Sequence, residues 1–202
     1  MIVRDAKFSS AECEAISGVS QELQRNWRRR GYLGLKAGGR AEYTPHDLAA
    51  LRVMKLLSEL MVGPALSARA AATAAPHIVW HALVNSPTAW QISGDRRRAA
   101  VLRKRLELVG HQHFDEMARL TGEQFRFCVV LADATALLTN DPGQLFMSGG
   151  YEASQLLDLE NIGGRLSAKA KHPLMLVDAS DDPEIHHKRK GPPKSGSQGA
   201  LP

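Results

Sequence analysis

Hydrophobic positions in the first third of the chain recur every three or four residues, as in amphipathic helices, and short polar or glycine-containing turns interrupt them. Ser10, Ser20 and Thr44 each precede such a segment, and their side chains commonly cap helix N-termini. Pro45 strengthens the third start, because proline suits the first helical position. The pattern predicts helices over residues 11–16 and 20–30, a glycine-rich hairpin over 32–43, and a longer helix over 45–61.

The middle of the chain continues with helical spacing and many alanines. Pro76 and Gly110 are expected to interrupt helices there, because proline removes a backbone donor and glycine lowers helix propensity. The predicted segments are helices over 67–75, 76–84, 96–109 and 113–120, a connection over 86–94, and Asp95 as the cap of the basic helix.

After Gly122 the hydrophobic period changes to two, because Phe125, Phe127, Val129 and Leu131 alternate with other residues. This alternation predicts a strand that places Cys128 in a buried position. The remaining predictions are a partner strand over 136–139, short strands over 145–147, 155–157 and 174–177, and a helix over 159–171 capped by Asp158.

The first three predicted helices have the spacing of a helix-turn-helix followed by a wing. Val19, Leu23 and Trp27 fall at i, i+4 and i+8, so they form one stripe that can pack against Leu48 and Leu51 of the third helix. Gly18 allows the sharp turn between the first two helices. The outward face is then expected to carry Gln21, Glu22, Gln24, Arg25, Arg28 and Arg29.

Such an outward face lies in the major groove of DNA in helix-turn-helix proteins. Amides and arginines can pair with base edges, while the remaining arginines suit phosphates. Lys36 and Arg40 flank the glycine-rich tip and can reach an adjacent phosphate or the minor groove. The candidate DNA contacts are Ser20, Gln21, Glu22, Gln24, Arg25, Arg28, Arg29, Lys36, Arg40 and Tyr43.

This segment resembles the MerR-type winged helix-turn-helix over about residues 7–63. The resemblance lies in Phe8-Ser9-Ser10, Gly18-Val19-Ser20, Arg25, Trp27, Gly31-Tyr32-Leu33, Tyr43-Thr44-Pro45 and Asp47-Leu48. It implies a bacterial or phage DNA-binding protein, commonly a dimer on a pseudo-palindromic site. Excisionase-like and terminase-like relatives share the winged fold.

The chain departs from the family pattern at several positions. Gln24 stands where an apolar residue is usual, and Ala41 stands where the wing usually carries arginine, with Arg40 one position early. The cysteine pair with which some members bind metal is missing, so the resemblance does not extend to metal or thiol sensing. Residues 95–120 are the one candidate for a dimerisation helix.

The whole pattern predicts an α+β fold that is mainly α. The expected division is a winged helix-turn-helix over 1–63, a helical connector with a dimerisation role over 64–122, a small α+β unit over 123–178 and a disordered tail over 179–202. That tail is rich in Gly, Pro, Ser and charged residues, which cannot bury a core. The α+β unit can serve in dimerisation, small-molecule sensing or docking of a protein, and protein contact is favoured slightly over sensing.

Charge is distributed unevenly along the chain. Residues 1–110 carry 17 Lys or Arg and 9 Asp or Glu, whereas residues 111–177 carry 5 and 8. A basic front half is typical of proteins that bind polyanions. The clusters at 96–98 and 103–105 are interpreted as a solvated helix face, with a second phosphate-binding surface as the alternative.

Cofactor and catalytic motifs are not recognisable in the sequence. His77 and His81 fall at i, i+4, but no third ligand stands nearby, so they are expected to be core or surface histidines rather than a zinc site. Cys13 and Cys128 are far apart, which fits a reduced compartment. The sequence predicts neither a membrane span nor a secretory signal.

The sequence therefore predicts a sequence-specific DNA-binding protein, a MerR-like transcription regulator rather than an enzyme. Its expected partners are double-stranded DNA, a second copy of the chain as a homodimer, and a protein bound through the C-terminal half. We expect it in the cytoplasm, associated with the nucleoid. The alternative is a protein–protein adaptor, or a recombination or packaging accessory factor, that reuses a winged helix.

Overall fold

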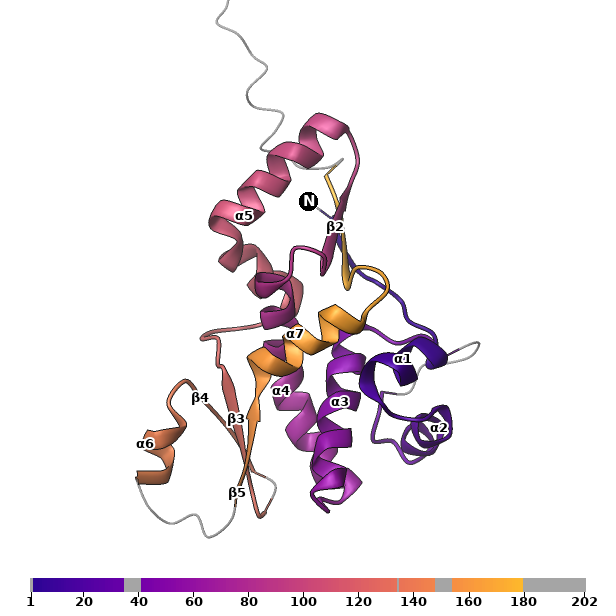
Figure 1. Cartoon of the computed structure of the whole chain (residues 1–202), viewed down its shortest axis with the longest axis vertical. Helices are drawn as coiled ribbons and strands as arrows, with labels where there is room; N and C mark the ends of the chain where they lie inside the picture. The colour runs from indigo at the N-terminus through magenta and orange to yellow at the C-terminus, as the bar shows by residue number, and fades with distance from the viewer. Residues whose placement is uncertain (1, 35–40, 134, 148–153, 180–202) are drawn as a thin grey trace, which may run out of the picture.

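The computed structural model describes residues 2–34, 41–133, 135–147 and 154–179 (Figure 1). They form a mixed α+β structure with helices at its N-terminal end and two small sheets. The elements in chain order are β1 (Ile2–Asp5), α1 (Ser10–Ser17), α2 (Gln21–Arg29), α3 (Pro45–Glu59), α4 (Pro64–Asn85), β2 (Trp90–Ser93), α5 (Arg96–Ala118), β3 (Phe127–Leu131), β4 (Ala136–Thr139), α6 (Pro142–Met147), β5 (Ser154–Asp158), α7 (Leu159–Lys169) and β6 (Met175–Asp178).

The first three helices begin where their capping side chains dictate. The caps predicted at Ser20 and Thr44 are confirmed, and Thr44 forms a reciprocal capping box with Asp47. The first helix begins one residue earlier than predicted, because Ser9 rather than Ser10 is its N-cap. Ser9 Oγ and the Ser9 amide each donate to the Glu12 carboxylate at 2.7 Å, and these two bonds lower the pKa of Glu12.

The expected interruptions of the central helices are wrong. Helix α4 continues through Pro76, and α5 continues across residue 110. An internal proline costs a helix about 3 kcal/mol and a glycine about 1 kcal/mol relative to alanine. Helix α4 is buried over most of its second half, from His77 to Leu83, and such burial outweighs the local cost of Pro76.

The predicted hairpin of β3 and β4 is confirmed, as are the strands at β5 and β6, the helix α7 and the burial of Cys128. The strand predicted over residues 145–147 is wrong, because those residues end helix α6. The Asp141 carboxylate accepts from the amides of Gly143 and Gln144, and Pro142 follows it, so this local cap starts a helical turn. The tail predicted to be disordered lies, beyond Ala179, outside the described residues.

The first sheet joins three distant parts of the chain in the order β1-β6-β2. Strand β6 pairs antiparallel with β1 and parallel with β2. Neither β1 nor β2 was predicted from the sequence, where residues 86–94 were expected only to connect two helices. The division into four segments remains a prediction. The sheet nevertheless takes one strand from each of the three segments that precede the tail.

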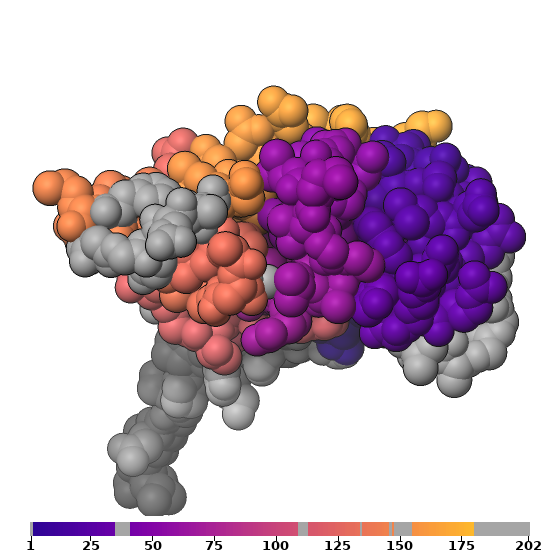
Figure 2. All heavy atoms as spheres, turned by 90° about the horizontal axis from the view of Figure 1, so that it is seen from below, coloured from indigo at the N-terminus to yellow at the C-terminus, as the bar shows by residue number. Residues whose placement is uncertain are grey.

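The core lies between the helices α3, α4 and α7 (Figure 1). Figure 2 shows the molecule from below. The N-terminal part of the chain (indigo) lies on one side, the α3–α4 region lies in the middle, and the C-terminal elements lie on the other side. Helices α4 and α7 approach closely at Gly163. A Cβ atom there would lie 2.6 Å from the Ile78 carbonyl oxygen, so only glycine fits without a shift.

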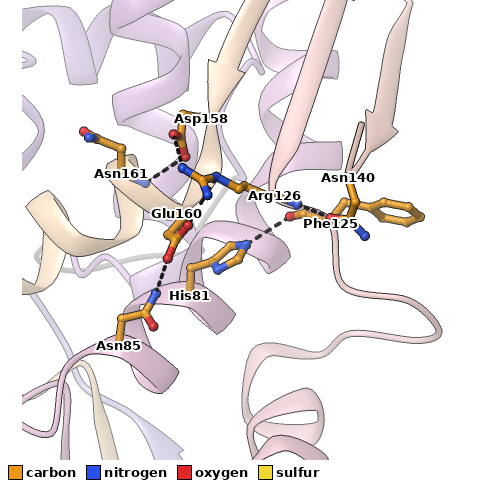
Figure 3. A network of polar contacts seen from close by, with 8 residues as sticks. All are labelled: His81, Asn85, Phe125, Arg126, Asn140, Asp158, Glu160 and Asn161. Atoms are coloured by element: carbon orange, nitrogen blue, oxygen red, sulfur yellow. Dashed lines mark hydrogen bonds and ion pairs between the residues drawn. The ribbon is translucent and has the colours of Figure 1, made fainter. Parts of the chain in front are cut away.

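The second sheet, in the order β4-β3-β5, is joined to α4 through the backbone of Phe125, and Arg126 joins it to the start of α7. The Phe125 amide donates to His77 Nδ1 at 3.2 Å, and the Phe125 carbonyl lies 3.1 Å from His81 Nε2. Arg126 forms ion pairs with Asp158 and Glu160, both at 3.2 Å (Figure 3). These contacts hold the sheet in place beside the helical core.

No helix among the described residues is both long and apolar enough to cross a lipid bilayer.

Candidate nucleic-acid interface

Helix α2 is held from behind by the apolar stripe that its sequence predicts. Val19 is fully buried, Trp27 is 5% exposed, and Leu23 packs against the same core cluster, which also includes Leu48 and Leu51. Ser20 caps the helix by accepting from the Leu23 amide at 3.3 Å. The structure therefore fixes the orientation of α2, and in both overall views the helix lies at the side of the molecule away from the second sheet (Figures 1 and 2).

Gln24 does not point outward, so this expectation is wrong. Its side chain is fully buried, and its Nε2 donates to the carbonyls of Ser10 at 3.1 Å and Val19 at 2.8 Å. These bonds join α2 to the start of α1 and to the preceding turn. A buried side chain cannot reach a base edge, so Gln24 is a positioning residue for the helix.

The turn between α1 and α2 is fixed by hydrogen bonds and by a glycine. Ser17 Oγ donates to the Cys13 carbonyl at 2.6 Å and accepts from the Val19 amide at 3.2 Å. Gly18 has a φ of 78°, in the left-handed region that favours glycine. Arg52 of α3 donates to the Ser17 carbonyl at 3.3 Å, so the third helix holds the turn directly.

The solvent-facing side of α2 presents four polar side chains around an open hollow, and these are Glu22, Arg25, Asn26 and Arg29. Their spacing of i, i+3, i+4 and i+7 places them on one face. Asn26 was missed in the sequence, although this spacing identifies it. Gln21 is exposed beside this face and donates to Glu14 at 3.1 Å, and Arg25 Nε donates to the Gln21 carbonyl.

Tyr43 is not an exposed contact residue, because its side chain is 2% exposed. The Arg28 guanidinium lies over the Tyr43 ring, with its carbon 5.2 Å from the ring centre. Burial raises the pKa of Tyr43, and the Arg28 charge opposes that rise. Arg28 is therefore half-buried on an aromatic support, whereas Arg25 and Arg29 are exposed.

A short antiparallel bridge pairs Phe8, just before α1, with Tyr43, just before α3. Each amide donates to the other residue's carbonyl at 2.9 Å. This bridge joins the segment before α1 to the segment just before α3. Lys36 and Arg40, the predicted wing contacts, lie outside the described residues.

The arrangement described so far is a short helix, a glycine turn, an anchored second helix and a capped third helix. Residues 8–63 match the MerR HTH family of regulatory proteins. The resemblance seen in the sequence is thereby confirmed for this segment, which covers less than a third of the chain. A MerR-family helix-turn-helix indicates a DNA-binding regulator. No curated protein matches the chain.

Outside the MerR-type segment, two histidines of α4 and one cysteine of β3 are buried. His77 and His81 are buried, and burial lowers the pKa of both, to about 4 for His77. Burial raises the pKa of the Cys128 thiol to about 11. Within the described ranges, no three His, Cys, Asp or Glu residues are grouped so that they could hold a metal ion.

Proposed function

We propose that this chain is a sequence-specific DNA-binding transcription regulator, a MerR-like protein of a bacterium or phage, that reads the major groove with helix α2. The observation that carries the proposal is the anchored helix with an exposed polar face. Gln21, Glu22, Arg25, Asn26 and Arg29 face solvent or lie on the open hollow of a helix whose other side is buried. Side chains of this kind pair with base edges and phosphates.

In this proposal the roles of the side chains differ. Gln21, Arg25 and Asn26 contact bases, while Arg29 contacts a phosphate, and Ser20 and Glu22 border the contact at the start of α2. Arg28, whose guanidinium lies over the Tyr43 ring, contacts the phosphate backbone of the DNA. Lys36 and Arg40 contact the adjacent phosphates as a wing. Two copies of the chain bind a pseudo-palindromic site in the cytoplasm, and residues of the C-terminal half contact a protein partner.

The test replaces Arg25 and Arg29 by alanine together. We expect the affinity for selected genomic fragments to fall at least tenfold, because two cations that contact bases or phosphates are lost. A mobility shift against fragments selected by the wild-type protein measures the change. The matched control is Arg69→Ala with Arg165→Ala, two exposed arginines on α4 and α7, which should bind as the wild type does.

Two outcomes would overturn the proposal. One is a wild-type protein that retains no genomic fragment at low salt. The other is a double variant that binds as tightly as the control while remaining folded, which would favour the protein–protein adaptor instead.

A further inference from the structure

The first half of α5 carries a dense cluster of positive charge that the helix-turn-helix does not use. Residues 96–108 contain six Lys or Arg and one acidic residue, Glu107. Arg96, Arg97, Arg103 and Lys104 are exposed, and we call these four side chains the α5 basic face. In Figure 1, α5 lies at the end of the molecule opposite α2 and α3.

The position of these arginines opposes helix stability. The N-terminal end of a helix carries partial positive charge, so cations in the first turn destabilise it. Helix α5 nevertheless begins with Arg96 and Arg97 and has no acidic residue in its first turn. The Asp95 cap, which accepts from the amides of Arg97 and Arg98, offsets part of this charge. The helix dipole therefore gives no reason for Arg96 and Arg97 to stand at these positions.

The α5 basic face has no salt-bridge partner within the part of the chain that the structure describes. Arg103 instead lies over the Trp90 ring at 5.0 Å from its centre, which holds the guanidinium at the surface. An unpaired and exposed cluster of this kind is suited to an external anion.

The helix that carries this face is fixed to the rest of the molecule. Leu102 and Leu106 are buried on the opposite side of α5, and His46 Nε2 lies 3.0 Å from the Ala118 carbonyl at its end. Arg96 and Arg97 precede Arg103 and Lys104 by seven residues, which is about 10.5 Å along a helix. The two pairs can therefore contact separate phosphates of one duplex.

A second copy that presented its own α5 basic face would be a poor occupant, because the two faces would repel each other. Duplex DNA carries a high density of negative charge and is the ligand of the proposed function. We propose that the α5 basic face makes a second, sequence-independent contact with the phosphate backbone of duplex DNA, outside the contact made by α2. This inference rests on the proposed function.

The test replaces all four residues by alanine in the full chain (R96A/R97A/R103A/K104A). The probe is a 60-base-pair duplex of random sequence, and the readout is the dissociation constant between 50 and 200 mM salt. We expect affinity at 100 mM salt to fall by roughly tenfold or more, and the slope of log K against log salt to become shallower by about 0.9 for each lost phosphate contact. The melting temperature should stay the same or rise, because the first-turn cations are gone.

Two comparison proteins make the result interpretable. The matched control removes four exposed cations elsewhere, as Arg69→Ala, Arg165→Ala, Lys169→Ala and Lys171→Ala, and should keep the wild-type salt slope. The α2 variant, Arg25→Ala with Arg29→Ala, reports on the proposed function separately.

An α5 variant that keeps the wild-type affinity and salt slope would overturn this inference. That result is also the one expected if the α5 basic face binds an acidic protein rather than DNA. If the α5 and control variants lose affinity equally, general charge explains the effect and the inference is also overturned. If the wild-type protein itself binds no duplex, the proposed function fails first.

Discussion

Two glutamines on α2, three residues apart, have different roles that their chemical identity does not reveal. Gln21 is exposed beside the open face, whereas Gln24 is buried and donates to two backbone carbonyls. The interpretation of Gln24 as a DNA contact followed from its polarity. The family preference for an apolar residue at this position was the signal for burial. Two hydrogen bonds donated by Nε2 explain how an amide is accommodated there, whereas Oε1 has no partner.

Replacing Gln24 by alanine should lower the free energy of unfolding by about 2–3 kcal/mol, because the Ser10 and Val19 carbonyls lose their donor and a cavity forms. Gln21→Ala should change it by less than about 0.5 kcal/mol, as expected for an exposed position. Chemical denaturation of both variants measures the difference. Gln24→Met keeps the volume and isolates the hydrogen bonds. Equal stability of the two alanine variants would contradict the positioning role of Gln24.

At the scale of elements, the crossing of α4 and α7 depends on one glycine. A Cβ atom at Gly163 would approach the Ile78 carbonyl oxygen and the Ala82 amide nitrogen within 2.9 Å, whereas the same atom at the adjacent Gly164 meets nothing within 4 Å. Both glycines belong to α7. Alanine at residue 163 therefore tests the close packing of the two helices, whereas alanine at residue 164 tests helix propensity alone.

Gly163→Ala should reduce the free energy of unfolding by about 1–3 kcal/mol, since the two backbones must move apart. Gly164→Ala should raise it by up to about 1 kcal/mol, because alanine is the better helix former. Thermal unfolding followed by circular dichroism measures both. A Gly163→Ala protein as stable as Gly164→Ala would show that the crossing is looser than the structure indicates.

The continuity of α4 shows why element boundaries were harder to predict than element types. Pro76 is a strong local signal for a break, and the sequence gives no measure of how much of the helix is buried. Burial of α4 in the core decides the outcome. At residues 145–147 the apolar run suggested a strand, but the local cap at Asp141 starts a helix instead, so here a local signal decided the outcome.

At the scale of the whole molecule, two buried histidines connect the helical core to the second sheet. His77 accepts from the Phe125 amide and therefore has to be neutral at Nδ1. Burial, reinforced by repulsion from His81, lowers the pKa of His77 from the usual 6.5 to about 4. Because the unfolded chain binds a proton more readily at this residue, stability from His77 is complete above pH 6.5 and is lost as the pH falls towards 4.

The free energy of unfolding should consequently fall between pH 6.5 and pH 4, with His77 contributing up to about 1.4 kcal/mol per pH unit. Burial also lowers the pKa of His46 and His81, which adds to the same trend. Denaturant titrations at pH 7.5, 6 and 5 measure the slope, and His77→Gln should make it shallower. A wild-type stability that stays constant or rises over this range would exclude the proposed linkage.

Much of the helix-turn-helix could be predicted from the sequence, because its signals are local. The caps at Ser20 and Thr44, the glycine at residue 18 and the i, i+4, i+8 stripe are each complete within a few residues. The exposure of Arg25 and Arg29 follows from that stripe. The burial of Gln24 and Tyr43 does not, because each depends on a neighbouring segment.

The sequence by itself determined the order of most helices and strands, the position of the MerR-type segment and the side of α2 that faces solvent, because capping and periodicity act over a few residues. Only the tertiary structure decided the first sheet, in which β6 joins strands from the start and the middle of the chain, and the close crossing at Gly163. Such pairings depend on contacts between distant residues, whose partners no local pattern records.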